Sequence, residues 1–269
     1  MKQDTPWTYS GYRRRQTLRI WTIALVIGFC AYWAGVSCKV DVDALRTGLP
    51  KGIDFLGYLF PPDWTAFADM AMPALETILL AFLATIFGAF LSLFFGLAAA
   101  SNIAPRWLRN LSRFLLATER SLPEIVILLL LISALGLGPF PGVIAMAFGC
   151  IGMLGRLFSD AIEEINPATL ESIESVGARR WQVITYGVLP QVLPSLLANT
   201  IFRFEVNIRL SVLLGAVGAG GIGFQLYYSF QTLQYQRATT AILITLLLVF
   251  VSERLSDYVR KKLTLDARL

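Results

Sequence analysis

One apolar stretch in the last third of the chain carries polar and charged side chains at helical spacing. Asn199, Arg203 and Asn207 recur every four residues, so on a helix they form one stripe that drifts by about 40° per step. Glu205 lies roughly opposite Arg203 and precedes Arg209 by four residues, which is the favourable order for an ion pair within a helix. Charges inside a membrane helix face the bundle interior or a water-filled path.

Two interpretations of this stripe follow. In the first, Arg203 and Arg209, together with the two asparagines, line the pathway of an anion and lower its electrostatic barrier. In the second, Arg203 and Glu205 form ion pairs with other helices and only fix their packing. The candidate partners in that second role are Glu119, Arg120, Glu124, Arg156 and Asp160.

A glycine-rich run follows the stripe. Gly218-Ala-Gly220-Gly221-Ile-Gly223 matches the GxGxxG pattern of dinucleotide-binding folds. That pattern also requires a strand before it and an acid about 20 residues later. Here an apolar helix is expected before the run, and residues 239–246 contain no acid. The glycines therefore favour close helix packing or local unwinding instead.

The residue types that are missing exclude several kinds of enzyme. The chain has no histidine, which excludes Ser-His-Asp and Cys-His catalysis and every histidine-ligated metal site. Cys30, Cys38 and Cys150 lie far apart and form no CxxC pair, which indicates packing or lipid-facing thiols. No lysine stands in a GxxxxGKS/T motif, so the chain has no phosphate-binding loop of its own. We predict no catalytic residue, no metal site and no ATP hydrolysis by this chain.

The composition indicates a membrane protein. The 269 residues are 56% hydrophobic and 15% charged, with a mean hydropathy of +0.63, and soluble domains of this size rarely have so few charges. We predict an all-α fold with six transmembrane helices, because six apolar stretches approach the length that crosses a bilayer core of about 30 Å. These stretches are residues 20–38, 73–100, 113–135, 142–157, 196–215 and 238–251.

The spans divide the chain into an expected N-terminal tail (1–19), a first helix (20–38), a loop (39–72), a transmembrane domain (73–253) and a C-terminal tail (254–269). The first helix is interpreted as a span and not as a cleavable signal, because it is long and lacks an A-x-A exit. Pro123 can kink the third span.

The distribution of basic residues indicates the orientation. Sixteen lysines and arginines fall in the two tails and in the loops at 101–113 and 156–194, against four on the other side. Because positive charge accumulates on the cytoplasmic side, both termini and the loop at 162–194 are predicted to be cytoplasmic, and residues 39–72 periplasmic. The basic C-terminal run follows a span and has little aromatic interleaving, so we expect contact with anionic lipid and not with nucleic acid.

The interval 162–194 predicts a helix-turn-helix. Asn166 can cap a first helix that begins at Pro167, and Gly177 is a natural break after it. A second, short helix is expected to end at Leu189-Pro190. Apolar residues recur at helical spacing in both helices: Leu170, Ile173, Trp181, Ile184 and Val188. Between two membrane spans, such an element can insert into a groove on another protein.

This interval resembles the EAA loop of ABC importer permeases, which couples the membrane subunit to its ATPase. Glu171-Ser172-Ile173 is followed by Gly177, six residues after the glutamate, and then by Leu189-Pro190. The usual motif has alanines at positions 172 and 173 and an isoleucine at Gly187. The resemblance assigns ATPase coupling to Glu171, Ser172, Ile173, Gly177, Ala178, Leu189 and Pro190.

The resemblance extends over most of the chain from the second span onward. Glu76-Thr77 and Ser101-Asn102 look like the two ends of the first helix of the permease core. Arg120-Ser-Leu-Pro-Glu124 and the segment 203–223 are similar to the phosphonate and phosphite subgroup, although methionine and sulfonate permeases share parts of them. In the family, the glycine run lies near the outer mouth, which implies outer-gate positions at Gly215, Gly218, Gly220, Gly221 and Gly223.

The resemblance implies a five-helix permease (MetI-like) core preceded by one added N-terminal helix in a bacterial inner membrane. It implies ATP-driven import of phosphonates or related phosphorus oxyanions (phosphite, hypophosphite) by alternating access. The expected partners are a cytoplasmic ABC ATPase dimer, which binds ATP and Mg, and a periplasmic solute-binding protein. A second permease copy is also expected, in a C2 homodimer or as a paired paralogue. We expect no cofactor on this chain itself.

Three alternatives remain. The chain could serve another solute, such as methionine or a sulfonate. It could be an intramembrane enzyme that uses Glu119, Glu124, Asp160 or Glu205, or a membrane scaffold without transport. Strict dependence on an ATPase and a binding protein would favour transport, whereas turnover by the purified chain alone would favour an enzyme.

Overall fold

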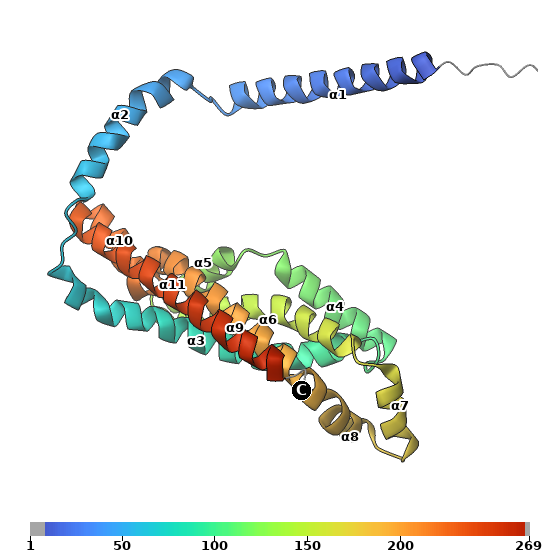
Figure 1. Ribbon diagram of the computed structural model, residues 1–269. Helices are drawn as coiled ribbons and strands as arrows, with labels where there is room; N and C mark the ends of the chain where they lie inside the picture. Colours follow the sequence, from blue (N-terminus) through green and yellow to red (C-terminus); the bar gives the residue numbers. More distant parts are fainter. Residues whose placement is uncertain (1–8, 267–269) are drawn as a thin grey trace, which may run out of the picture. The chain divides into compact units, whose positions relative to one another are not determined.

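The computed structural model describes residues 9–266, and these residues form helices and turns without a strand (Figure 1). The predicted all-α class is therefore confirmed. The α-helices are α1 (Tyr9–Ser37), α2 (Val42–Leu59), α3 (Ala66–Ala99), α4 (Arg106–Arg120), α5 (Glu124–Leu135), α6 (Pro139–Glu163), α7 (Pro167–Ser175), α8 (Arg180–Gln182), α9 (Leu189–Leu214), α10 (Gly221–Gln231) and α11 (Tyr235–Asp266). Two π-helical turns, η1 (Val183–Val188) and η2 (Gly215–Ala219), flank α9.

The chain divides into two compact units, residues 1–57 and 58–269. In the first unit, α1 contains an apolar segment, Gln16–Ser37, that is long enough to cross a membrane, as expected for residues 20–38. The interval expected to be a loop, 39–72, instead holds α2 and the start of α3. In α2, apolar side chains at Leu45, Leu49 and Leu56 recur at the three- to four-residue spacing of a helix face.

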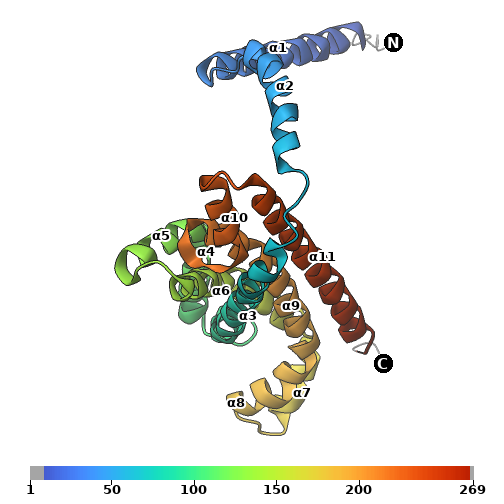
Figure 2. The ribbon, with the colours of Figure 1, turned by 90° about the vertical axis from the view of Figure 1, so that its left-hand side faces the viewer.

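The second unit is built around the close pair α3 and α6. A Cβ atom added at Gly88 of α3 would lie 2.3 Å from the Cβ of Cys150, and one added at Gly96 would lie 2.7 Å from the Cβ of Phe158. Glycines at these crossings let the two helices approach closely, as small residues do in membrane bundles. Helix α9 packs against α3, α6 and α11 (Figure 2).

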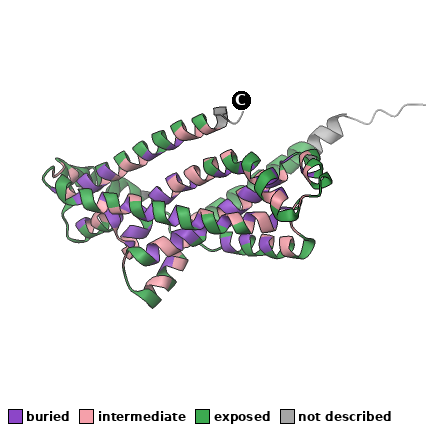
Figure 3. Ribbon diagram, turned by 90° about the horizontal axis from the view of Figure 1, so that it is seen from below, coloured by how far each residue is buried: buried purple, intermediate pink, exposed green. Residues whose placement is uncertain are grey.

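Buried residues lie on the faces that these helices turn toward one another, and exposed residues run along the outer faces (Figure 3). Many of the exposed side chains are large and apolar, such as Phe87, Phe90 and Phe94 on α3. Apolar surface of this extent requires lipid or a partner subunit to cover it.

Among residues 9–266, four helices are long and apolar enough to cross a membrane, and the bent assembly of α8–η2 with α10 makes a fifth. The expected third span, 113–135, is divided between α4 and α5 by a break just before Glu124, with Pro123 at the N-cap of α5. Helix α5 has 12 residues, which is short for a full span. The predicted count of six spans is therefore not reproduced by length and composition alone.

Two helix boundaries differ from the expected ones. Helix α3 begins at Ala66, seven residues before Pro73, because a turn at Asp63 precedes it. The Asp63 carboxylate accepts hydrogen bonds from the Thr65 hydroxyl (2.5 Å) and N–H (3.0 Å), and the hydroxyl bond lowers the pKa of Asp63. Helix α11 continues well beyond residue 251, into the interval expected to be a tail. Residues 1–8 and 267–269 of the two tails lie outside the described part of the chain.

Candidate functional site

The interval 162–194 is called the coupling segment, after the role that the resemblance implies. Its first helix begins and ends as predicted. The Asn166 side chain accepts a hydrogen bond from the Ala168 N–H (3.0 Å), and Pro167 is the first residue of α7. The amide thus satisfies one of the N–H groups that a helix start leaves unpaired. After α7, Gly177 has φ +84°, a conformation that glycine adopts without steric cost. The sharp turn therefore follows directly from the sequence.

The second helix of the coupling segment differs from the prediction, because it does not end at Leu189-Pro190. Residues 180–214 form one continuous helical run, α8–η1–α9, in which Pro190 lies in the first turn of α9. The wider π-helical turn before Pro190 accommodates a residue that has no N–H. The Gln191 side chain donates to the Gly187 carbonyl (2.5 Å), which satisfies one carbonyl at this junction.

Two departures from the EAA motif contact each other. A Cβ atom added at Gly187 would lie 2.7 Å from Cδ1 of Ile173. The larger side chain at position 173 is therefore accommodated by the loss of a side chain at position 187. We interpret the two departures as an exchange of side-chain volume between α7 and η1.

The base of the coupling segment is buried, whereas its tip is exposed. Leu170, Val183 and Val188 belong to one buried cluster with Phe158 and Ile162 of α6. Large apolar side chains at the tip and along η1 are exposed instead: Val176 (83%), Trp181 (57%) and Tyr186 (70%). The segment projects from the end of the bundle opposite α10 (Figures 1 and 2). This arrangement presents apolar anchors on a rigid support, as groove-binding helices do.

A cavity of about 530 Å³ lies between the coupling segment and the 100–105 turn. The motif residue Glu171 lines it, together with Glu174 and Arg180, and Asn102 and Pro105 line the facing side. Glu171 is thus partly directed toward the 100–105 turn of the same chain.

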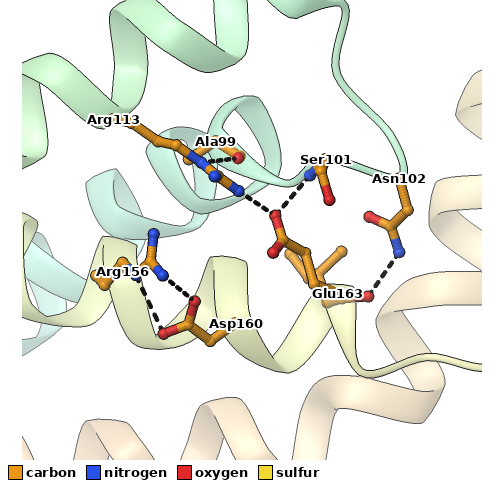
Figure 4. A network of polar contacts seen from close by, with 8 residues as sticks. Ala99, Ser101, Asn102, Arg113, Arg156, Asp160 and Glu163 are labelled. Atoms are coloured by element: carbon orange, nitrogen blue, oxygen red, sulfur yellow. Dashed lines mark hydrogen bonds and ion pairs between the residues drawn. The ribbon is translucent and has the colours of Figure 1, made fainter.

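A polar network joins the ends of α3, α4 and α6 beside the coupling segment (Figure 4). Glu163, the last residue of α6, accepts hydrogen bonds through Oε1 from the Ser101 N–H (2.6 Å) and from Arg113 Nη2. Arg113 of α4 also donates through Nε to the Ala99 carbonyl (3.0 Å) at the end of α3. One acid thereby connects three helices.

Two further contacts accompany this network. The Asn102 side chain donates to the Ile162 carbonyl (2.8 Å), which ties the α3–α4 turn to the end of α6. Earlier in α6, Arg156 and Asp160 form an i,i+4 ion pair (3.0 Å) within the helix. In Figure 4 this pair lies next to the network and is not connected to it.

In the polar stripe of α9, Arg203 is buried and paired. Its side chain is 4% exposed and donates to Glu124 at the start of α5 (3.2 Å). The guanidinium also contacts the sulfur atoms of Cys150 and Met153 on α6, each at 3.3 Å. Of the two interpretations of Arg203, this geometry matches the packing role. The neighbouring acid Glu119 lies instead against Gly152.

The other stripe residues divide between interior and surface. Asn207 is fully buried and donates to the Thr85 hydroxyl (2.8 Å) and to Cys150 Sγ (3.1 Å). Arg209 pairs with Glu205 as predicted, and its side chain remains 44% exposed. Asn199 is half-buried and lines a cavity of about 450 Å³ between α9 and α11. Arg209 and Asn199 thus reach the surface of the bundle, whereas Arg203 and Asn207 do not.

The glycine run bends the chain at the opposite end of the bundle. Between Ala219 and Gly221 the helix axis turns by 54°, and Gly218, Gly220 and Gly221 have φ values of +114°, +86° and +70°. Gly215 and Gly223 are required by close contact: added Cβ atoms would lie 2.3 Å from the Gly220 carbonyl oxygen and 1.9 Å from the Val212 carbonyl oxygen. The run therefore unwinds a helix, as its composition indicates.

The bend is held by the Glu76-Thr77 pair of α3. Glu76 Oε2 accepts a hydrogen bond from the Gly221 N–H (3.0 Å), and Thr77 Oγ1 accepts one from the Ile222 N–H (2.8 Å). A carboxylate at a helix start also interacts favourably with the helix dipole. Glu76-Thr77 and the glycine run are each recognisable in the sequence, but no sequence pattern predicts that they contact each other.

Sequence reasoning also missed the contacts of Cys150 and the role of Arg113 and Glu163. None of the three lies in a motif, and the Arg113–Glu163 and Cys150–Arg203 contacts join residues that are 50 or more positions apart in the chain. Within residues 9–266, no three His, Cys, Asp or Glu side chains are grouped so that they could hold a metal ion.

Solved structures of similar fold include an inward-facing methionine ABC transporter, with a TM-score of 0.65 at 20% sequence identity, covering 75% of this chain and 99% of that one. A bacterial alginate ABC transporter gives a TM-score of 0.59 at 18% identity, covering 92% of this chain and 99% of that one. At these identities the likeness concerns the fold alone.

Among curated sequences, a phosphate-import permease protein, PhnE, of Mycolicibacterium smegmatis is 34% identical over 252 residues, which is 93% of this chain but 47% of that protein. The chain thus spans about half the length of this relative. A phosphite transport system permease protein, PtxC, of Stutzerimonas stutzeri is 34% identical over 89% of this chain and 87% of that protein. Residues 92–265 match the model of the binding-protein-dependent transport system inner membrane component family. The chain belongs to this family of multi-pass inner-membrane permease components of ABC importers.

Proposed function

We propose that this chain is the membrane-spanning permease subunit of an ATP-driven importer for phosphonates or related phosphorus oxyanions such as phosphite. The observation that carries the proposal is the coupling segment. It is a capped helix and turn with exposed apolar side chains at Val176 and Trp181, held on a buried base. Such an element is suited to transmit force from a partner that binds its tip.

The substrate class is supported by the relatives, which are named for phosphate and phosphite transport and align with most of this chain. A permease named for D-methionine transport is also similar, at 26% identity over 72% of the chain. The higher identity and coverage of the first group favour a phosphorus oxyanion over methionine. We assign the choice among these oxyanions mainly to the separate binding protein.

In the proposed mechanism, two ATPase subunits bind ATP and Mg and close, and their grooves draw two coupling segments together. Because each chain has one segment and an ATPase dimer offers two grooves, a C2 homodimer is the simplest assembly. The bend held by Glu76 lies at the other end of the bundle, where we place the outer gate that opens to a loaded periplasmic binding protein. This chain supplies no group that hydrolyses ATP.

The orientation follows from the charge distribution. We place the coupling segment and both termini in the cytoplasm, because sixteen of the lysines and arginines lie on that side against four on the other. The α10–α11 turn and α2 then face the periplasm.

The proposal is tested in vesicles that contain the purified chain, its ATPase and its binding protein. We expect ATP-dependent uptake of phosphite or a phosphonate, and no uptake of methionine. Gly177→Asp should abolish uptake while leaving insertion intact, because φ is positive at this turn.

Gly52→Asp is the control for the added carboxylate, since Gly52 is exposed on α2 with open space around it and lies outside the coupling segment. It should retain uptake. Uptake of methionine but of no phosphorus oxyanion would overturn the substrate assignment, and full uptake by Gly177→Asp would remove the segment from the mechanism.

A further inference from the structure

Helix α6 ends with an acidic residue, although the helix dipole disfavours a negative charge at that end. The C-terminus of a helix carries partial negative charge and unpaired carbonyls, so cations are stabilising there and carboxylates are not. Glu163 is nevertheless the last residue of α6. Its partners explain the choice, because Arg113 and the Ser101 N–H both donate to its Oε1. The acid is thus stabilised by other helices and not by its own.

The same contacts satisfy groups at the ends of the neighbouring helices. Arg113 Nε donates to the Ala99 carbonyl at the end of α3 (3.0 Å), and Asn102 donates to the Ile162 carbonyl at the end of α6 (2.8 Å). The Glu163 and Arg113 side chains are 26% and 35% exposed, so the pair is partly shielded from solvent. The ends of α3, α4 and α6 are therefore held as one unit immediately before α7.

We propose that Glu163 is a positioning residue that makes α3 and α4 follow the coupling segment when the segment moves. The inference rests on the proposed function, because it concerns how force from an ATPase reaches the membrane helices. Three residues separate Glu163 from Pro167, the first residue of α7, so a displacement of α7 acts directly on the network. Without the network, α6 moves with the segment, α3 follows through its packing on α6 and the hydrogen bond from Ser92 to the Cys150 carbonyl, and α4 loses its charged tie to α6.

The chain provides a matched control for this proposal. Arg156 and Asp160 carry the same pair of charges as Arg113 and Glu163, but both lie on α6 and pair with each other within that helix. Removal of the Asp160 charge changes the local electrostatics of α6 but breaks no contact drawn to α3 or α4 (Figure 4). Asp160→Asn therefore separates a general charge effect from the loss of the connection.

The experiment measures ATP hydrolysis and phosphite uptake by the full complex in vesicles, with and without loaded binding protein. Glu163→Gln should keep basal hydrolysis close to wild type while uptake per ATP falls roughly five- to tenfold, the scale of a typical coupling energy. Asp160→Asn should match wild type in both quantities. Arg113→Gln should resemble Glu163→Gln, and the double variant should be no worse than either single variant, because the two residues act through one contact.

A purely structural role would instead lower folded yield, hydrolysis and uptake in equal proportion and would leave uptake per ATP unchanged, which would overturn the proposal. If Glu163→Gln fails to fold, Arg113→Lys supplies the same test. The lysine ammonium keeps the charge, but it lacks the planar guanidinium that donates to Glu163 and to the Ala99 carbonyl at the same time. Unchanged uptake per ATP in that variant would also overturn it. A wild-type complex that moves no phosphorus oxyanion would overturn the proposed function, and this inference with it.

Discussion

Ile173 and Gly187 show how two unusual residues in a motif can be a single adjustment. Replacement of Gly187 by isoleucine, the usual residue of the motif, places new atoms where Ile173 Cδ1 now lies. We expect overpacking to cost about 1–3 kcal/mol in unfolding free energy. Ile173→Ala combined with Gly187→Ile should recover most of that loss, which thermal unfolding of the purified chain measures. Equal destabilisation of the single and double variants would contradict the proposed exchange of volume.

Arg203 gives the second prediction at the scale of single residues. Arg203→Gln leaves Glu124 without its partner and removes the contacts to Cys150 and Met153. Breaking a fully buried pair costs about 3–5 kcal/mol, and we expect less here because Glu124 is 28% exposed.

The expected result for Arg203→Gln is a lower unfolding temperature and an equal fractional loss of uptake and ATP hydrolysis. The double variant Glu124→Gln/Arg203→Gln should be more stable than Arg203→Gln alone, because position 124 then carries no unpaired charge. A selective loss of anion uptake at normal stability would contradict the packing role and favour a pathway role for Arg203.

Among the helices, α7 depends on its first residues. Asn166→Ala removes the bond to the Ala168 N–H and should cost about 1 kcal/mol of local helix stability. We expect faster proteolysis within the coupling segment and weaker stimulation of the ATPase. Asn166→Asp retains a cap and should behave as wild type. Identical proteolysis of both variants would show that the cap does not control the segment.

The bend before α10 depends on a contact from α3. Glu76→Ala removes the acceptor of the Gly221 N–H, whereas Glu76→Gln keeps an oxygen at that place. We expect Glu76→Ala to reduce ATPase stimulation by the loaded binding protein several-fold at unchanged basal hydrolysis, and Glu76→Gln to have a smaller effect. If Glu76→Ala shows the same ATPase stimulation as the wild type, the bend is not part of the outer gate.

Features that depend on neighbouring residues could be predicted from the sequence, whereas contacts between distant residues could not. The Asn166 cap, the Gly177 turn and the unwound glycine run were predictable, because each is decided by residues close together in the chain. The end expected at Leu189-Pro190 was wrong because a π-helical turn absorbs the proline. Contacts such as Glu163 with Arg113, or Glu76 with Gly221, join distant positions and left no pattern in one sequence.

At the scale of the molecule, the second unit has the coupling segment at one end and the bend before α10 at the other (Figure 1). The close α3–α6 pair runs between these ends, and Gly88 and Gly96 bring the two helices into direct contact at Cys150 and Phe158. Closely packed helices have low compressibility and transmit strain along their contact. The architecture is thus suited to convert a displacement at the segment into a rearrangement at the bend.

The most direct test is a gentle detergent purification of the tagged chain from its native cells, with mass spectrometry of the proteins that accompany it. We predict an ABC ATPase and a solute-binding protein in the eluate, and a phosphorus oxyanion bound to the latter. Recovery of the chain alone, or only with unrelated membrane proteins, would contradict the claim that residues 162–194 couple this chain to an ATPase.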